Sequence, residues 1–176
     1  MLASRLVRSI AAQTRSIHAE ARLAALGKKL PEPGAPKGSY VTAQWADDNT
    51  LHLAGHLPTN EKGELIKGKV GKDVTVEQAN KAAESACLSL LATLKKELGD
   101  LDQVKQVVKV VGFVNCVDGF EQQPAVINGC SDLLGKVFTD GKGVHARSAV
   151  GTNALPLNVA VEIEMIVKTH GKPIKK

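Results

Sequence analysis

The sequence predicts a single α+β domain in which a mixed β-sheet carries two helices on one face. Its 176 residues are enough for one domain with a sizeable core. Two observations predict this class: five segments are rich in β-branched residues, and two longer segments repeat apolar residues at helical spacing. Their order along the chain is β-β-α-β-α-β-β, which is typical of two helices packed against one sheet.

The composition agrees with a globular protein that needs neither a membrane nor disulfide bonds. Apolar residues make up 43% and charged residues 23%, and no apolar run approaches the roughly 18 residues that cross a bilayer. The three cysteines Cys87, Cys116 and Cys130 are widely spaced and form no CxxC pair. A disulfide framework and a structural zinc site are therefore not expected, and a reducing compartment fits best.

The net charge of +5 comes mainly from the N-terminus. Arg5, Arg8 and Arg15 lie within residues 1–19, which contain no acid, so the rest of the chain carries only +2. A basic, serine-containing, acid-free segment with one apolar helical face predicts a mitochondrial presequence and import into the matrix. The alternative is an ordinary N-terminal extension. No basic stripe with aromatic residues indicates nucleic-acid binding.

The first elements are short. An Ala/Leu-rich helix is expected from residue 19 to residue 30, ended by Gly27 and a Pro/Gly linker over 31–36. Strands are expected at 40–46 and 50–54, because the Asp-Asp-Asn sequence between them has the composition of a hairpin turn.

The clearest helix begins after Thr75. Thr75 and Gln78 form a capping box, in which each side chain can bond the backbone N–H of the other residue. Apolar residues then recur at helical spacing up to Leu98, and Gly99 ends the helix.

The second half of the chain repeats this alternation. A long strand is expected over 104–115 and a second helix over 124–138, with its apolar side chains on one side. Two alternating apolar segments, 145–150 and 159–167, predict the last strands, separated by a turn with Gly, Asn and Pro.

A candidate site lies on these last two strands. Arg147 can bind a carboxylate through two parallel bonds, which Lys cannot do. Glu162, on a strand expected to be its neighbour, could handle a proton or a water beside the bound anion. Glu164 points to the same face as Glu162. The alternatives are a surface salt bridge for Arg147 and solvated or interface carboxylates for the glutamates.

Several ordered motifs carry a family resemblance. The C-terminal pattern A-R-S-x-V…L-P-x-x-V-x-V-E-I-E resembles the signature of the YjgF/Rid family, the reactive enamine/imine deaminases. The segments at 38–41, 53–58, 111–114 and 126–128 resemble further family motifs, so the match covers most of the chain. The resemblance implies a chorismate-mutase-like fold, a homotrimer with clefts between subunits, and the following division: presequence 1–19, helix and linker 20–37, family domain 38–168, polar tail 169–176.

The resemblance also implies roles for individual residues. Arg147 would clamp the substrate carboxylate, helped by the backbone N–H of Ala149, and Glu162 would activate water. Tyr40 would border the cleft, and the alternative is that it packs at the end of the sheet. Asn128, on the second helix, is either a polar helix position or a cleft hydrogen-bond donor. Gly55, a further candidate site residue, indicates a close backbone approach.

Four positions depart from the family pattern. Ala149 stands where many members have Cys, Ala54 where they have Ser, His56 where they have Gln, and His145 where they have Pro. His56 and His145 would add titratable groups near the cleft, whereas a lone histidine is more often structural. These departures bear on substrate preference.

The resulting expectation is a mitochondrial enzyme that hydrolyses 2-enamine and 2-imine carboxylates to 2-keto acids and ammonia. No metal or organic cofactor is expected, because an imine is already electrophilic. The alternatives are a non-catalytic trimer that binds small carboxylates, a structural subunit of a mitochondrial assembly, and an endoribonuclease, which the missing basic patch argues against.

Overall fold

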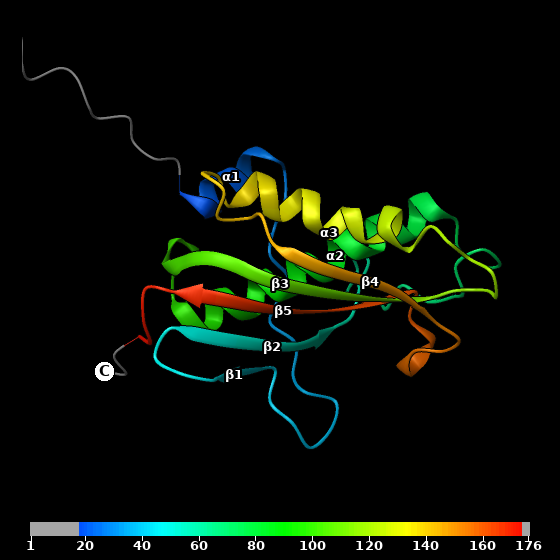
Figure 1. The fold of residues 1–176 in the computed structure, drawn as a ribbon, viewed down its shortest axis with the longest axis horizontal. Helices are drawn as coiled ribbons and strands as arrows, with labels where there is room; N and C mark the ends of the chain where they lie inside the picture. Colours follow the sequence, from blue (N-terminus) through cyan, green and yellow to red (C-terminus); the bar gives the residue numbers. More distant parts are fainter. Residues whose placement is uncertain (1–17, 174–176) are drawn as a thin grey trace, which may run out of the picture.

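A five-stranded sheet forms the centre of the protein, for which a computed structural model describes residues 18–173 (Figure 1). The strand order is β1-β2-β5-β3-β4; β3 and β4 are parallel, and the other neighbours are antiparallel. β1 and β4 are therefore the two edges. The strands are β1 (Ala43–Trp45), β2 (Thr50–His56), β3 (Val104–Asn115), β4 (Ala146–Thr152) and β5 (Val161–Thr169).

Two long helices, α2 (Val76–Leu98) and α3 (Gln123–Val137), pack on one face of the sheet. Thr75 caps α2 through the expected capping box with Gln78. The helices approach each other closely at Gly129, where an added Cβ would lie 2.0 Å from the Asn80 carbonyl oxygen. The predicted helices over 75–98 and 124–138 are thus confirmed to within one residue at each end.

The alternation of β5 separates the two faces of the sheet. Val161, Ile163, Met165, Val167 and Thr169 are buried, while the residues between them are half-buried or exposed. The buried set faces α2 and α3, as periodicity two requires. The opposite face has no helix over it in the described part of the chain, and we call it the open face.

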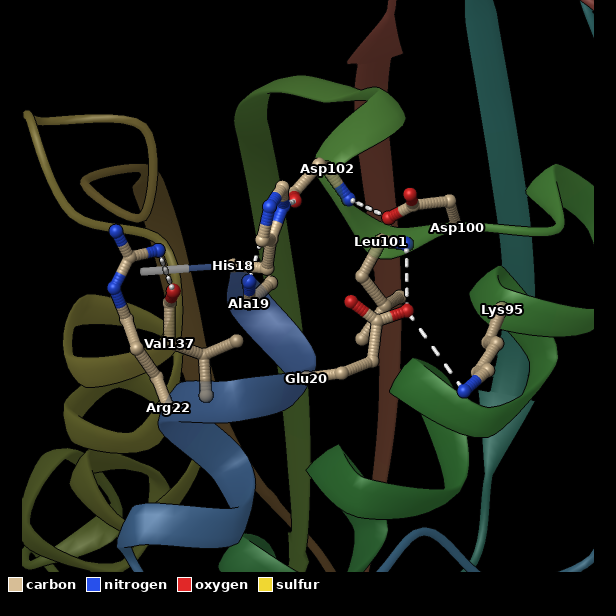
Figure 2. A network of polar contacts seen from close by, with 9 residues as sticks. All are labelled: His18, Ala19, Glu20, Arg22, Lys95, Asp100, Leu101, Asp102 and Val137. Carbon is tan, nitrogen blue, oxygen red and sulfur yellow. Dashed lines mark hydrogen bonds and ion pairs between the residues drawn. The ribbon is translucent and has the colours of Figure 1, made fainter. Parts of the chain in front are cut away.

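A third helix, α1 (Ala19–Ala25), fastens the start of the described chain to the domain (Figure 2). Ala19 is only 1% exposed, and its N–H donates to Asp102 Oδ1 at 3.0 Å. Arg22 Nη1 donates to the Val137 carbonyl oxygen at the end of α3. The folded part therefore includes Ala19, which the sequence grouped with the presequence. His18, also within the expected presequence, is described as the N-cap of α1, and residues 1–17 lie outside the described residues.

Several boundaries differ from those predicted. α1 ends at Ala25 and not near residue 30, because Gly27 adopts a left-handed φ of 68° that terminates the helix. β1 is shorter than expected, whereas β2 continues to His56. Two short 3-10 helices, η1 (Leu101–Gln103) and η2 (Pro156–Asn158), were not predicted. No helix among residues 18–173 is long and apolar enough to span a membrane.

Candidate functional site

Arg147 lies on the edge strand β4 and reaches across to α3. It pairs with the buried Val110 of β3, so its side chain is on the helix-covered side of the sheet. Its Nη1 donates to Asn128 Oδ1 at 2.8 Å and to Ser131 Oγ at 3.0 Å, and its Nη2 donates to the Pro124 carbonyl oxygen at 3.4 Å. Asn128, a predicted site residue, thus accepts a hydrogen bond from Arg147.

These bonds leave part of the guanidinium available. A guanidinium has five N–H donors in a planar fork, and three are used by partners within residues 18–173. The Nε–H and one Nη2–H remain, on neighbouring nitrogens. Such a pair can donate to both oxygens of one carboxylate.

Ser131 is a site residue that the sequence reasoning missed. It lies one helical turn after Asn128, so both side chains face the same way. Its hydroxyl also lies 3.0 Å from His145 Nε2. The signal was present in the sequence as an N-x-x-S spacing on a predicted helix. His145 is thus close to Arg147, as expected.

Glu162 lies on the open face. It pairs with Phe113 of β3, and its carboxylate lies over Gly55, where an added Cβ would approach Glu162 Oε1 to 1.9 Å. A larger residue there would push the Glu162 side chain aside, which agrees with the close approach expected of Gly55. Burial, and next the charge of Glu164, raise the pKa of the half-buried Glu162 carboxyl.

Arg147 and Glu162 do not share a site within one chain, which corrects the expectation that their strands are neighbours. β3 lies between β4 and β5. The two side chains also lie on opposite faces of the sheet, because Arg147 pairs with the buried Val110 and Glu162 with Phe113 of the open face. The chain order β4-β5 suggested a hairpin, but the parallel pairing of β4 with β3 separates the strands.

His56 is not a cleft residue, contrary to expectation. It is 7% exposed and lies between β2 and α2. Its Nδ1 is 2.7 Å from the Ala54 carbonyl oxygen and its Nε2 is 2.7 Å from Thr93 Oγ1. Since a carbonyl only accepts, Nδ1 carries the proton and Nε2 accepts from Thr93. Burial lowers the pKa of His56. These contacts agree with the alternative reading of His56 as a structural histidine.

Tyr40 and Ala149 lie at different edges. Tyr40 precedes β1, is 47% exposed, and its hydroxyl accepts the Lys37 N–H at 3.3 Å. Ala149 is half-buried on β4, where its side chain packs against the core. Tyr40 therefore comes just before the edge strand β1, whereas Arg147 is on the opposite edge strand β4.

None of these residues belongs to a metal-binding group. Among residues 18–173, the only three acidic, histidine or cysteine side chains whose ligand atoms lie within 4.8 Å of one another are Glu20, Asp100 and Asp102. Glu20 is on α1, and Asp100 and Asp102 lie next to this helix (Figure 2). Glu20 accepts the Leu101 N–H, and its Oε1 lies 3.8 Å from Lys95 Nζ.

The fold is that of an α+β protein in which an arginine on the edge strand β4 is held by three acceptors on α3. The chain belongs to the family described as "YjgF/chorismate mutase-like, putative endoribonuclease", whose model matches residues 20–168. The predicted family and its chorismate-mutase-like fold are confirmed.

Individual relatives agree with this assignment. Protein TCP17 of Trypanosoma cruzi is 41% identical over 159 residues, which cover 88% of this chain and 99% of the relative. A "putative endoribonuclease" from Shewanella oneidensis has a similar structure, with a TM-score of 0.81 and 30% identity, over 86% of this chain and 99% of the other. A protein of unknown function from Agrobacterium tumefaciens has a TM-score of 0.78 and 40% identity, over 86% and 94% of the chains.

Proposed function

We propose that this protein hydrolyses reactive 2-enamine and 2-imine carboxylates, of the 2-aminoacrylate type, to 2-keto acids and ammonia. The observation that carries the proposal is the Arg147 guanidinium, which three acceptors hold in place while two donors on neighbouring nitrogens remain. A small carboxylate has two oxygens that match such a pair. Membership of the YjgF family supports the same substrate class.

Glu162 supplies the base in this proposal. Water adds to the imine carbon as the carboxylate takes its proton, and the imine nitrogen leaves as ammonia, so that R–C(=NH)–COO⁻ and water give R–CO–COO⁻ and NH₃. The raised pKa of Glu162 makes its carboxylate a stronger base than an exposed glutamate. The reaction requires no further cofactor in this scheme.

The proposed site needs a second copy of the chain. Arg147 and Glu162 lie on opposite faces of one sheet, so two copies must meet for both groups to reach one substrate. We propose a homotrimer in which the open face contacts its neighbours; Val111, Phe113 and Ile166 on that face are half-buried apolar side chains that favour burial. A monomer at micromolar concentration in sedimentation would contradict this assembly.

Three proteins compared in two assays test the function. Wild type should release ammonia from freshly generated 2-aminoacrylate. Glu162→Gln keeps the shape but removes the base, so turnover should fall about 10²–10⁴-fold while a 2-keto acid still binds. Arg147→Lys should weaken keto-acid binding in calorimetry about ten- to hundredfold, from the loss of roughly 1.5–3 kcal/mol.

The matched controls are Glu61→Gln, an exposed loop carboxylate, and Arg22→Lys, whose guanidinium bonds the Val137 carbonyl oxygen. Both should behave as wild type. Unchanged keto-acid binding by Arg147→Lys would remove the basis of the proposal. It would favour the structural-subunit alternative.

A second candidate is a non-catalytic carboxylate binder. Ala149 favours it, because the thiol that many family members carry there is missing. A relative from Lactococcus lactis, 30% identical over 132 residues (74% of this chain, 87% of the relative), is named "Putative regulator AldR". Keto-acid binding without ammonia release by wild type would support the binder. RNA cleavage by wild type that Glu162→Gln abolishes would instead support an endoribonuclease.

The location is proposed to be the mitochondrial matrix, on the basis of the basic N-terminal segment. A fluorescent fusion of the full chain should enter mitochondria, and one lacking residues 1–17 should not. Mature mitochondrial protein that still begins at Met1 would contradict processing.

A further inference from the structure

We infer that Ser131 and His145 are positioning residues that orient the Arg147 guanidinium for a carboxylate, an inference that rests on the proposed function. Neither residue is part of the family motif quoted above, and His145 stands where the family often has Pro. The two side chains come from α3 and from the segment leading into β4. They meet at one oxygen, the Ser131 hydroxyl, which lies 3.0 Å from both Arg147 Nη1 and His145 Nε2.

The direction of each bond follows from its partners. His145 Nδ1 lies 2.7 Å from the Gly143 carbonyl oxygen, which can only accept, so Nδ1 carries the ring proton. When Nδ1 carries the only ring proton, Nε2 is an acceptor. The Ser131 hydroxyl must donate to it, and its lone pairs remain for Arg147.

The hydrogen bond to His145 sets the orientation of the Ser131 hydroxyl, and the Ser131 hydroxyl in turn sets the orientation of the Arg147 guanidinium. Without His145, the Ser131 O–H could rotate toward other acceptors, and its lone pairs would turn away from Arg147. Bonds arranged in series also polarise one another and strengthen the whole chain. The backbone that carries His145 is itself constrained, since an added Cβ at Gly143 would lie 2.3 Å from the Leu134 carbonyl oxygen of α3.

Ser131 and Asn128 together use both hydrogens of Nη1. Rotation about the Cζ–Nη1 bond and tilting of the guanidinium plane are therefore opposed, and the donors left for a ligand keep one direction. Ordering a free arginine on binding would cost about two- to tenfold in affinity, from the usual entropy of one long side chain. We expect Ser131 and His145 to remove most of that cost.

The first test measures keto-acid affinity by calorimetry, with pyruvate as the probe. Ser131→Ala and His145→Ala should each bind about two- to tenfold more weakly, and Ser131→Thr, which keeps the hydroxyl, should restore most of the loss. Ser89→Ala is the matched control, because among residues 18–173 its hydroxyl bonds only the Ser85 carbonyl oxygen within α2. In the double variant, His145→Ala should add nothing to Ser131→Ala if His145 acts through Ser131.

The second test needs no ligand. The chain has five arginines, Arg5, Arg8, Arg15, Arg22 and Arg147, so side-chain NMR of arginine-labelled full-length protein can assign Arg147 by comparison with Arg147→Lys. Slow Nη1 rotation should be visible in wild type and lost in Ser131→Ala and His145→Ala. Arg22, which bonds Val137, is the internal reference.

The two tests separate this inference from the proposed function. Wild type that shows an ordered Arg147, sensitive to both variants, but binds no pyruvate would overturn the function and leave the positioning role intact. Unchanged Arg147 signals and unchanged affinity in Ser131→Ala would overturn the positioning role. Equal losses in Ser131→Ala and Ser131→Thr, or additive losses in the double variant, would also overturn it.

Discussion

The two faces of the sheet differ in how many hydrogen-bond partners they give to their charged residues. On the helix-covered side, Arg147 finds three acceptors on α3, and its support is complete within one chain. On the open face, the Glu162 carboxylate accepts no hydrogen bond from residues 18–173. It lies over Gly55, in the space that the missing side chain leaves free. The anchor for a ligand is therefore built by the fold of one chain, whereas the proposed base has a raised pKa and no hydrogen-bonding partner in that part of the chain.

The same contrast separates the two histidines that the sequence grouped together. His145 is half-buried and bonds a side chain that holds Arg147. His56 is buried and links β2 to α2 through Thr93. A histidine expected near the cleft can thus lie beside Arg147 or in the core, and only its surroundings distinguish the two.

After Glu162→Gln, the largest expected effect on turnover comes from filling the space above Gly55. In Gly55→Ala the new Cβ would meet Glu162 Oε1 at 1.9 Å, so the carboxylate must move. A displacement of about 1 Å costs roughly a hundredfold in turnover, which the ammonia assay would measure. Gly135→Ala is the control, because its added Cβ meets no atom within 4 Å. Undiminished turnover in Gly55→Ala would show that the position of Glu162 is irrelevant.

A smaller effect on stability is expected from Thr93→Val. This change keeps the side-chain shape but leaves the buried His56 Nε2 without a donor, which costs about 1–3 kcal/mol. Urea unfolding should show the loss, while pyruvate affinity should not change. Thr42→Val, at a half-buried position whose hydroxyl has no hydrogen bond among residues 18–173, serves as the control. A change in pyruvate affinity without a change in the free energy of unfolding would indicate that His56 acts at the cleft.

His56 should also make the stability of the fold pH-dependent. Burial lowers the pKa of His56 below the usual 6.5. Below about pH 6.5, His56 therefore binds a proton in the unfolded chain but stays neutral in the folded chain until the pH reaches its lower, folded pKa. This contribution to stability is complete above that pH and is lost as the pH falls toward the folded pKa. His56→Gln should flatten the decline in urea titrations between neutral and mildly acidic pH. An unaltered slope would contradict the assignment.

The smallest effect is expected from Glu164→Gln. Burial is the main cause of the raised pKa of Glu162, and the charge of Glu164 is the second. Removing that charge should lower the pKa of Glu162 only in part, so its carboxylate form would persist to lower pH. The acid limb of the kcat/KM profile should then move to lower pH, without reaching the position of an exposed glutamate. A limb that moves to higher pH would exclude Glu162 as the titrating base.

The helices and the long strand β3 could be predicted because their signals are local. The capping box at Thr75 and the apolar spacing that follows it define α2 without any distant partner. The same holds for the alternation of β5. α1 was predicted too long, because the left-handed turn at Gly27 ends it early.

The sequence by itself determined the family, the two long helices and the five strands, and it singled out Arg147 and Asn128 as site residues. It could not determine that β3 separates β4 from β5, that Arg147 and Glu162 lie on opposite faces, or that His56 is in the core while His145 supports Arg147 through Ser131. The physical reason is that turns, caps and periodicity act over a few residues. Strand pairing and the neighbours of a side chain depend on contacts between segments far apart in the chain, and these are settled only when the sheet is assembled.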